Sequence, residues 1–261
     1  MNRKRILSFL GITTFVFIGG LVSLILFPQT LFAHSYTHDQ VTVYSNGPID
    51  EGAFNRALDQ ANAYLNESEL QDPSYRYDVF IAAGTPYNEF DNLVFGEWSV
   101  ARAIANNVII KRAVDLETLT VDNGHNAFDL VYVLTHEMVH CLQAHHFGMW
   151  TFNPFRHPPM WKLEGYPEYI ARRPLLDHPE YELRQGITDF LARTQVGDDP
   201  TRIIQIAERE STPYIYYKGR LMVEYLMDIR GFSYTDILED KRSEEEVYAE
   251  MLEWYGHMDP R

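Results

Sequence analysis

The sequence contains almost no cysteine and has little basic charge for its length. Its single cysteine, Cys141, has no second thiol to pair with, so an internal disulfide is excluded. The 22 Lys and Arg residues are outnumbered by 37 Asp and Glu residues, which gives a formal net charge of −15. We see no basic patch in this acidic chain, and a surface of this sign repels nucleic acid. We therefore expect no nucleic-acid partner.

Charge is also missing from a long stretch near the start of the chain. Residues 6–27 form an uncharged apolar run directly after the basic cluster 3–5. At about 1.5 Å per residue, a helix of this length crosses a bilayer. The positive-inside rule keeps the basic end in the cytoplasm. We expect residues 1–33 to be a single-pass anchor in the cell membrane, with the following domain outside. The alternative is secretion after cleavage near Ala33.

The clearest chemical motif lies in residues 131–143, VYVLTHEMVHCLQ, which contain an HExxH pattern. His136 and His140 are one helical turn apart on one face, so both imidazoles can bind one zinc ion. Glu137 flanks that point and can reach a water held at the metal, as a general base does. Apolar residues cover most sides of this helix, which indicates that it is buried. The alternative is a surface helix with two unrelated histidines.

Two glutamates follow in residues 161–171, WKLEGYPEYIA. A catalytic zinc site takes three protein ligands and keeps one position open. Glu164 comes 24 residues after His140, far enough for a second helix to pack against the first and bring the third ligand. Glu168, one turn later on the same face, would accept a hydrogen bond from the other nitrogen of a ligand histidine. The alternative is a solvated acidic pair.

HEMVH followed by WKLEGYPEY resembles the gluzincin zinc metallopeptidases, the thermolysin-like and aminopeptidase N-like group. The resemblance implies that His136, His140 and Glu164 bind Zn²⁺ and that Glu137 is the general base. It also implies that Glu168 supports a ligand histidine.

A third segment, 212–226, is similar to the Y-x-K-G segment of the aminopeptidase N-like enzymes. The match implies that Tyr216 donates a hydrogen bond to the oxyanion, with Tyr214 and Tyr217 as close alternatives. The G-x-M-E-N segment with which those enzymes hold a free amine is missing, because the nearest stretch, 100–111, has no acidic residue. Internal and terminal cleavage therefore both remain open.

Other histidines in the sequence are not expected to bind the metal. His145 and His146 are out of phase with the ligand face of the zinc helix. His125 lies in a turn-rich cluster, 122–126, which we expect to cap that helix, and Gly148 is expected to end it.

The periodicity predicts an α+β fold. Alternating apolar residues indicate strands, and apolar residues at helical spacing indicate helices. The strands are expected at 41–45, 75–82 and within 101–112, and the helices at 51–65, 180–193, 201–209, 214–229, 234–238 and 243–254. Residues 34–40 have the composition of a linker and 88–98 that of a loop.

These elements suggest two lobes after the anchor. The N-terminal lobe, residues 34–148, would hold a small mixed sheet and the zinc helix. The helical C-terminal lobe, residues 149–261, would supply the third ligand, with the active site in the cleft between them. The strand in 101–112 is either an ordinary core strand or, by the resemblance, an edge that pairs with a peptide. The aromatic segment 149–160 is either a wall of the substrate pocket or a crossover loop.

The expected function is that of a membrane-anchored or secreted zinc metallopeptidase acting on a peptide or protein substrate. A non-catalytic zinc-dependent module that binds peptides or cell-wall fragments is the first alternative. The second is an anchored structural protein in which the HExxH pattern is accidental.

Overall fold

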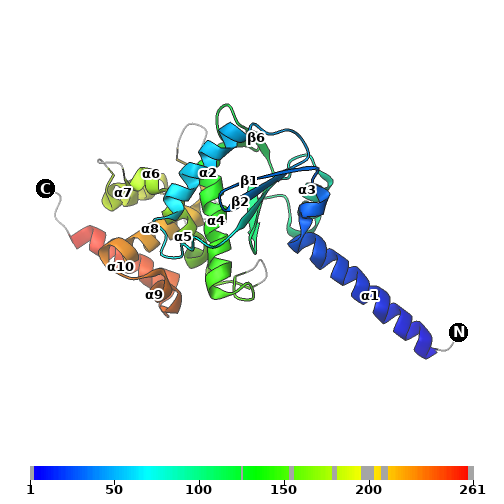
Figure 1. Cartoon of the computed structure of the whole chain (residues 1–261). Helices are drawn as coiled ribbons and strands as arrows, with labels where there is room; N and C mark the ends of the chain where they lie inside the picture. Colours follow the sequence, from blue (N-terminus) through cyan, green and yellow to red (C-terminus); the bar gives the residue numbers. More distant parts are fainter. Residues whose placement is uncertain are drawn as a thin grey trace.

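A five-stranded mixed sheet carries the first half of the chain. The computed structural model describes residues 3–124, 126–152, 156–177, 181–194, 203–206 and 211–257. The strand order is β1 (His34–His38), β2 (Val41–Ser45), β3 (Tyr77–Ile81), β5 (Asn107–Ile110) and β4 (Ala101–Ile104). The three central strands are parallel, and the two edge strands run antiparallel to their neighbours. With the helices packed on it, this sheet confirms the α+β class (Figure 1).

The two edge strands correct the sequence analysis. Residues 34–38, taken for linker, form β1; an exposed edge strand needs few apolar residues, so it leaves little alternation to recognise. The single strand expected within 101–112 is a hairpin of β4 and β5. Ala105 turns the chain with a φ of 56°, which an L-residue rarely adopts.

The sheet is covered on both faces because its central strands alternate two apolar sets. Val79 and Val108 face the larger core, which the helices α2 (Glu51–Leu65) and α4 (Leu130–Phe147) also line. Phe80 and Ile109 face the opposite way, into a smaller core. This period of two is what a strand buried on both sides requires.

The smaller core is closed by α3 (Pro86–Phe95), where the sequence analysis had predicted a loop. The helix begins with Thr85, whose hydroxyl accepts a hydrogen bond from the backbone N–H of Asn88, and Pro86 occupies its first turn. The expectation was wrong because the buried face of α3 includes polar Asn88 and Asp91, which weaken the apolar period.

The helix α1 (Arg3–Leu26) extends away from this body (Figure 1). The Nδ2 of Asn107 donates to the carbonyl oxygen of Leu26 at 3.1 Å, so the sheet caps the helix end. After the short helix η1 (Pro28–Leu31), Phe32 packs against the smaller core beside Leu26. Among the described residues, no helix is both long enough and apolar enough to cross a membrane.

A second, three-stranded sheet leads into α4. It consists of β6 (Ala113–Asp115), β7 (Thr120–Asp122) and β8 (Ala127–Asp129). The predicted cap for α4 was wrong: the cluster 122–126 joins β7 to β8, and the Asp129 carboxylate accepts from the N–H of Tyr132 instead. Gly148 ends α4 with a φ of 88°, as expected.

The second half of the chain is mainly helical. Its helices are α5 (Met160–Ala171), α6 (Arg173–Leu176), α7 (Leu183–Thr194), α8 (Tyr214–Glu224), α9 (Tyr234–Glu239) and α10 (Glu244–His257), with a π-helical turn at Tyr225–Ile229. The capping hydrogen bonds between Ser243 and Glu246 are present at the start of α10. The helix predicted at 201–209 was wrong, because β9 (Ile203–Gln205) pairs there with β10 (Ser211–Pro213).

Candidate metal centre

The helix α4 lies between the sheet and the helices of the second half of the chain (Figure 1). Leu134, Met138 and Cys141 bury its other sides in the larger core. The face that carries His136 and His140 is turned toward α5, which packs against α4. The sequence therefore folds locally so that the two histidines meet the second helix.

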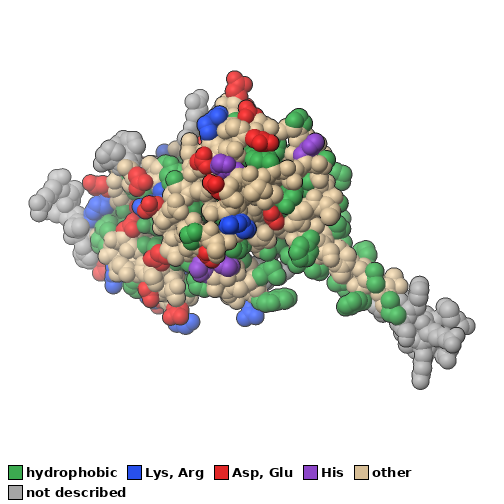
Figure 2. Space-filling view, viewed as in Figure 1, with side chains coloured by type: hydrophobic (Ala, Val, Ile, Leu, Met, Phe, Trp, Pro, Cys, Tyr) green, Lys and Arg blue, Asp and Glu red, His purple; other side chains and the backbone are tan. Residues whose placement is uncertain are grey.

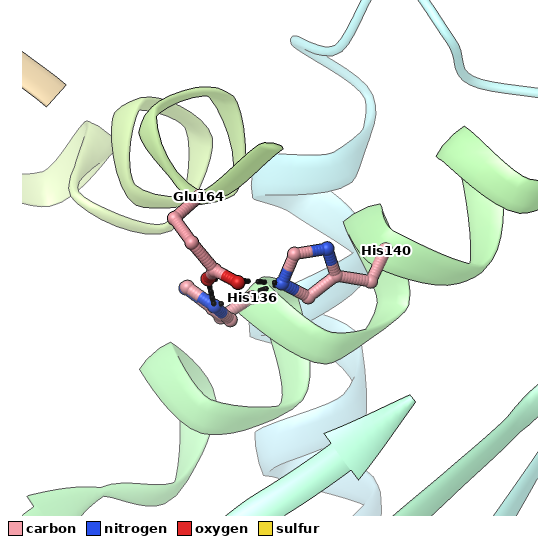
Figure 3. Close-up of side chains that lie close together, drawn as sticks. All are labelled: His136, His140 and Glu164. Carbon is pink, nitrogen blue, oxygen red and sulfur yellow. Dashed lines mark hydrogen bonds and ion pairs between the residues drawn. The ribbon is translucent and has the colours of Figure 1, made fainter. Parts of the chain in front are cut away.

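Glu164 on α5 points at the two histidines on α4 (Figure 3). The Oε2 atom of Glu164 lies 3.3 Å from Nε2 of His136 and 3.2 Å from Nε2 of His140. The two Nε2 atoms are 3.2 Å from each other. The structure thus brings together the three ligands predicted from the sequence, with one atom of each at a common point.

The spacing of these three atoms fits a zinc ion. In a tetrahedral site with bonds of about 2.0–2.1 Å, two ligand atoms lie about 3.3–3.4 Å apart. The observed distances of 3.2, 3.2 and 3.3 Å are close to this value. Two imidazole nitrogens and one carboxylate oxygen are also a ligand set that suits Zn²⁺. His136, His140 and Glu164 could therefore hold the metal.

The carboxylate of Glu168 lies behind His136, on the side away from Glu164 and His140. Its Oε1 atom is 3.3 Å from Nδ1 of His136. The hydroxyl of Tyr132 donates a hydrogen bond to the same oxygen, and Nε of Arg172 lies 3.5 Å from the other. These contacts hold the carboxylate where it can keep a proton on Nδ1, which leaves Nε2 of His136 free to bind a metal.

Gln143 does the same for His140, and the sequence analysis missed it. Its Oε1 accepts a hydrogen bond from Nδ1 of His140 at 2.7 Å. Its Nε2 donates to the carbonyl of Leu163 at 3.0 Å and to the hydroxyl of Tyr234 at 2.7 Å. The available signal was its position, three residues after His140 on the same helix.

The charges of the cluster favour a cation at its centre. Burial lowers the pKa of His136, but the contacts with Glu164 and Glu168 outweigh burial and raise it to about 10. Burial raises the pKa of Glu164, yet the neighbouring His140 and His136 hold it well below its usual range. Both pKa shifts arise from attraction between the carboxylates and positive charge on the histidines.

A cavity of about 570 Å³ opens onto this point. Its wall includes β4, the exposed side of α4, the start of α5 and the strand β10. Glu137 lines the cavity beside His136 and His140. Burial raises the pKa of the Glu137 carboxyl, an effect that the two histidines oppose. A carboxylate with a raised pKa is a better base toward water.

Tyr216 also lines the cavity, and its ring lies parallel to that of His136 with 6.0 Å between centroids. Burial, together with the charges of Glu164 and Glu137, raises the pKa of the Tyr216 phenol well above its usual value. The phenol therefore keeps its proton at neutral pH and is able to donate a hydrogen bond. The alternatives lie elsewhere, since Tyr214 and Tyr217 both pack against Phe190 and neither lines the cavity.

Two glycines of the sequence motifs explain how Tyr216 reaches the cavity. Gly165, next to Glu164, faces Gly219 where α5 crosses α8. A Cβ atom on Gly165 would lie 2.6 Å from the carbonyl oxygen of Gly219, which is too close for a real contact. The missing side chains let the two helix backbones touch, and this close packing places the first turn of α8 beside the histidines.

His145 and His146, which are not expected to bind the metal, lie outside the cluster. His145 lies 3.1 Å from Asp72, and His146 is hydrogen-bonded to the carbonyl of Leu70, so neither points to the metal ligands. His125 lies outside the described residues. In the segment 149–160, Met149, Phe152, His157 and Met160 line the cavity, as the wall interpretation predicts. Residues 153–155 of that segment are not among those described.

The comparisons with known proteins add no assignment to this geometry. No protein-family model matches the chain, and no curated protein matches it.

Proposed function

We propose that the chain is a zinc metallopeptidase of the gluzincin type. The observation that carries the proposal is the convergence of His136, His140 and Glu164 on one point at the wall of a cavity. Glu137 and Tyr216 line the same cavity, so all residues that the hydrolysis requires surround one space.

A zinc ion held by these three side chains would acidify a water molecule and polarise a peptide carbonyl. Glu137 takes a proton from the attacking water and then passes it to the leaving amine. Tyr216 donates a hydrogen bond to the oxygen on which negative charge develops. Glu168 and Gln143 keep the two histidines in the orientation that the ligand set needs.

The edge strand β4 favours a peptide as the substrate. The backbone N–H of Lys111 bonds to the carbonyl of Val100, so residues 100, 102 and 104 direct their backbone groups toward β5. Ala101 and Ala103 then direct theirs away from the sheet, and both line the cavity. An extended peptide can pair with such an edge through its main chain.

The proposal includes two lobes, residues 34–148 and 149–261, with the active site in the cleft between them. It also includes a membrane anchor in residues 6–27, with the catalytic domain outside the cell. Support for the anchor comes from the uncharged run in the sequence and from the exposed apolar side chains of the described part of α1 (Figure 2). Vesicle flotation of the full chain, with and without residues 1–33, tests the anchor.

The Glu137→Gln variant tests the catalytic role. We expect peptide hydrolysis to fall by about 10²–10⁴-fold, because the amide cannot accept the proton. Zinc content should stay at about one ion per chain, because Glu137 is not a ligand. Glu117→Gln, on an exposed turn, is the matched control and should retain full activity.

Three results would contradict the proposal in different ways. If Glu137→Gln kept full activity, Glu137 would not be the general base. A wild-type chain that binds zinc but cleaves no member of a peptide library would be a non-catalytic binding module. A wild-type chain that takes up no metal would be a structural protein with an accidental motif.

A further inference from the structure

The loop before β4 displays a tryptophan at the cavity. Trp98 is 98% exposed and is at the same time part of the cavity wall. A tryptophan ring loses the favourable burial of a large apolar surface when it stands in water. Single exposed apolar residues are common, so exposure alone assigns nothing. The hydrogen bonds around the loop distinguish Trp98 from such a residue.

Three basic side chains hold three successive backbone carbonyls of this loop. The carbonyl of Phe95 accepts from Arg102 at 3.4 Å, and that of Gly96 from Nζ of Lys111 at 2.7 Å. The carbonyl of Glu97 accepts from Arg112 at 2.5 Å. Hydrogen bonds to charged donors are the strong ones, so the loop is fixed immediately before Trp98.

Lys111, which donates to the carbonyl of Gly96, is itself buried, and burying its charge opposes folding. The side chain of Lys111 has no exposed surface, and its charge is balanced by buried Asp91 at 2.9 Å. Burying a lysine and an aspartate takes both out of water, which opposes folding unless they are well paired. A buried ion pair, Lys111 with Asp91, therefore holds the loop that carries Trp98.

The ring is next to the strand edge on which a peptide would lie. Trp98, Ser99 and Val100 line the cavity and lead directly into β4. Side chains of a peptide paired with β4 point alternately to the two sides of the extended sheet. One of them would meet the face of Trp98, and the backbone that carries this ring is already held by the three basic side chains.

We infer that Trp98 is a substrate-binding residue that stacks on an aromatic or large apolar side chain of an extended peptide. The inference deepens the proposed peptidase function, because it takes the peptide as the ligand of this cavity. It names the class of substrate: peptides with such a residue at one fixed position away from the bond that is cleaved.

The test measures peptide binding, so that it does not depend on turnover. The full chain carrying Glu137→Gln is loaded with zinc and titrated with a set of peptides in which phenylalanine replaces alanine at each position in turn. At one position, phenylalanine should tighten binding roughly tenfold, as expected for an aromatic contact plus buried area. Adding Trp98→Ala should abolish that preference, and adding Trp98→Phe should restore most of it.

Trp150→Ala is the matched control. Trp150 is 81% exposed but does not line the cavity, so this change should leave the preference intact. The inference is overturned if Trp98→Ala keeps the preference, or if it weakens phenylalanine and alanine peptides equally. It is also overturned if Trp98→Ala reduces only the binding of the chain to lipid vesicles, since the ring would then contact a membrane.

Failure of the proposed function gives a different result. If the wild-type chain hydrolyses none of the peptides but the Trp98-dependent preference is present, the inference stands and the peptidase proposal fails. If hydrolysis occurs without any Trp98-dependent preference, the peptidase proposal stands and the inference fails.

Discussion

Two clusters of buried charge stand near the cavity, and they differ in what their polar atoms contact. In the metal cluster, formed by His136, His140 and Glu164, three atoms converge on one point. The Asp91 cluster is formed by Asp91, Lys111 and Arg102. Lys111 lies 2.9 Å and Arg102 lies 3.5 Å from the Asp91 carboxylate, and both cations donate hydrogen bonds to backbone carbonyls.

The difference separates a site from a structural support. Both clusters remove charges from water, and burial opposes both. In the Asp91 cluster, one carboxylate pairs with two cations, and both cations also donate to backbone carbonyls. The cluster of His136, His140 and Glu164 instead brings three potential ligand atoms together at one point. Convergence of potential ligand atoms on one point, more than burial or charge, therefore distinguishes the two clusters.

Removing one carboxylate from each cluster should have the largest effects, and the effects should be of different kinds. Glu164→Ala should lose most of the bound zinc, because two histidines are one ligand short of the three that a catalytic zinc site takes. Asp91→Asn should keep the zinc but lose about 3–5 kcal/mol of unfolding free energy, because buried Lys111 would have no counter-charge. Metal analysis and urea unfolding of both variants measure these effects. If Glu164→Ala retained its zinc, the third ligand would have to be another residue, and Glu168 would be the next candidate.

The phenol of Tyr216 should affect the reaction and leave folding unchanged. Tyr216→Phe keeps the ring on His136 but removes the donor to the oxyanion. We expect kcat to fall by about 10²–10³-fold, with zinc content and unfolding free energy close to wild type. Tyr214→Phe and Tyr217→Phe are the controls, because their rings pack on Phe190 outside the cavity. A larger loss in either control would assign the oxyanion donor to that residue.

Gln143 should affect zinc binding although it lies outside the ligand set, because it is fully buried and accepts a hydrogen bond from His140. Gln143→Leu should weaken zinc binding by about 10–100-fold, because Nδ1 of His140 loses its acceptor. Gln143→Glu keeps that acceptor and should recover part of the zinc affinity. A competition titration with a chelator gives the affinities. Equal zinc affinity in all three proteins would limit Gln143 to packing.

The contact between α5 and α8 should give the smallest effect, because it involves no charge. Gly165→Ala places a methyl group against the carbonyl of Gly219 and should cost about 1–3 kcal/mol of unfolding free energy. Gly256→Ala, at an exposed position of α10 with open space around it, should instead stabilise the protein by about 0.4–1 kcal/mol. Thermal unfolding measures both. A neutral Gly165→Ala would show that the helices separate without cost.

Several elements could not be predicted because their signals are weak along the chain. β1 lies at an exposed sheet edge, and α3 buries polar Asn88 and Asp91, so neither shows a clean apolar period. The hairpin of β4 and β5 depends on a left-handed Ala105, which the sequence does not announce. Conversely, α2 was predicted with its observed bounds, 51–65, because its apolar residues recur at strict helical spacing.

The local chemistry of the candidate site follows from the amino-acid sequence alone. HExxH on a helix fixes His136 and His140 on one face, since four residues make about one turn. Which distant side chains lie beside the two histidines depends on the tertiary structure. Packing of α5 on α4 brought Glu164 within 3.3 Å of both histidines, and the contact at Gly165 carried Tyr216 to the cavity. The sequence motifs name Glu164 and Tyr216 as candidates, but the distances between them and the histidines depend on how the helices pack.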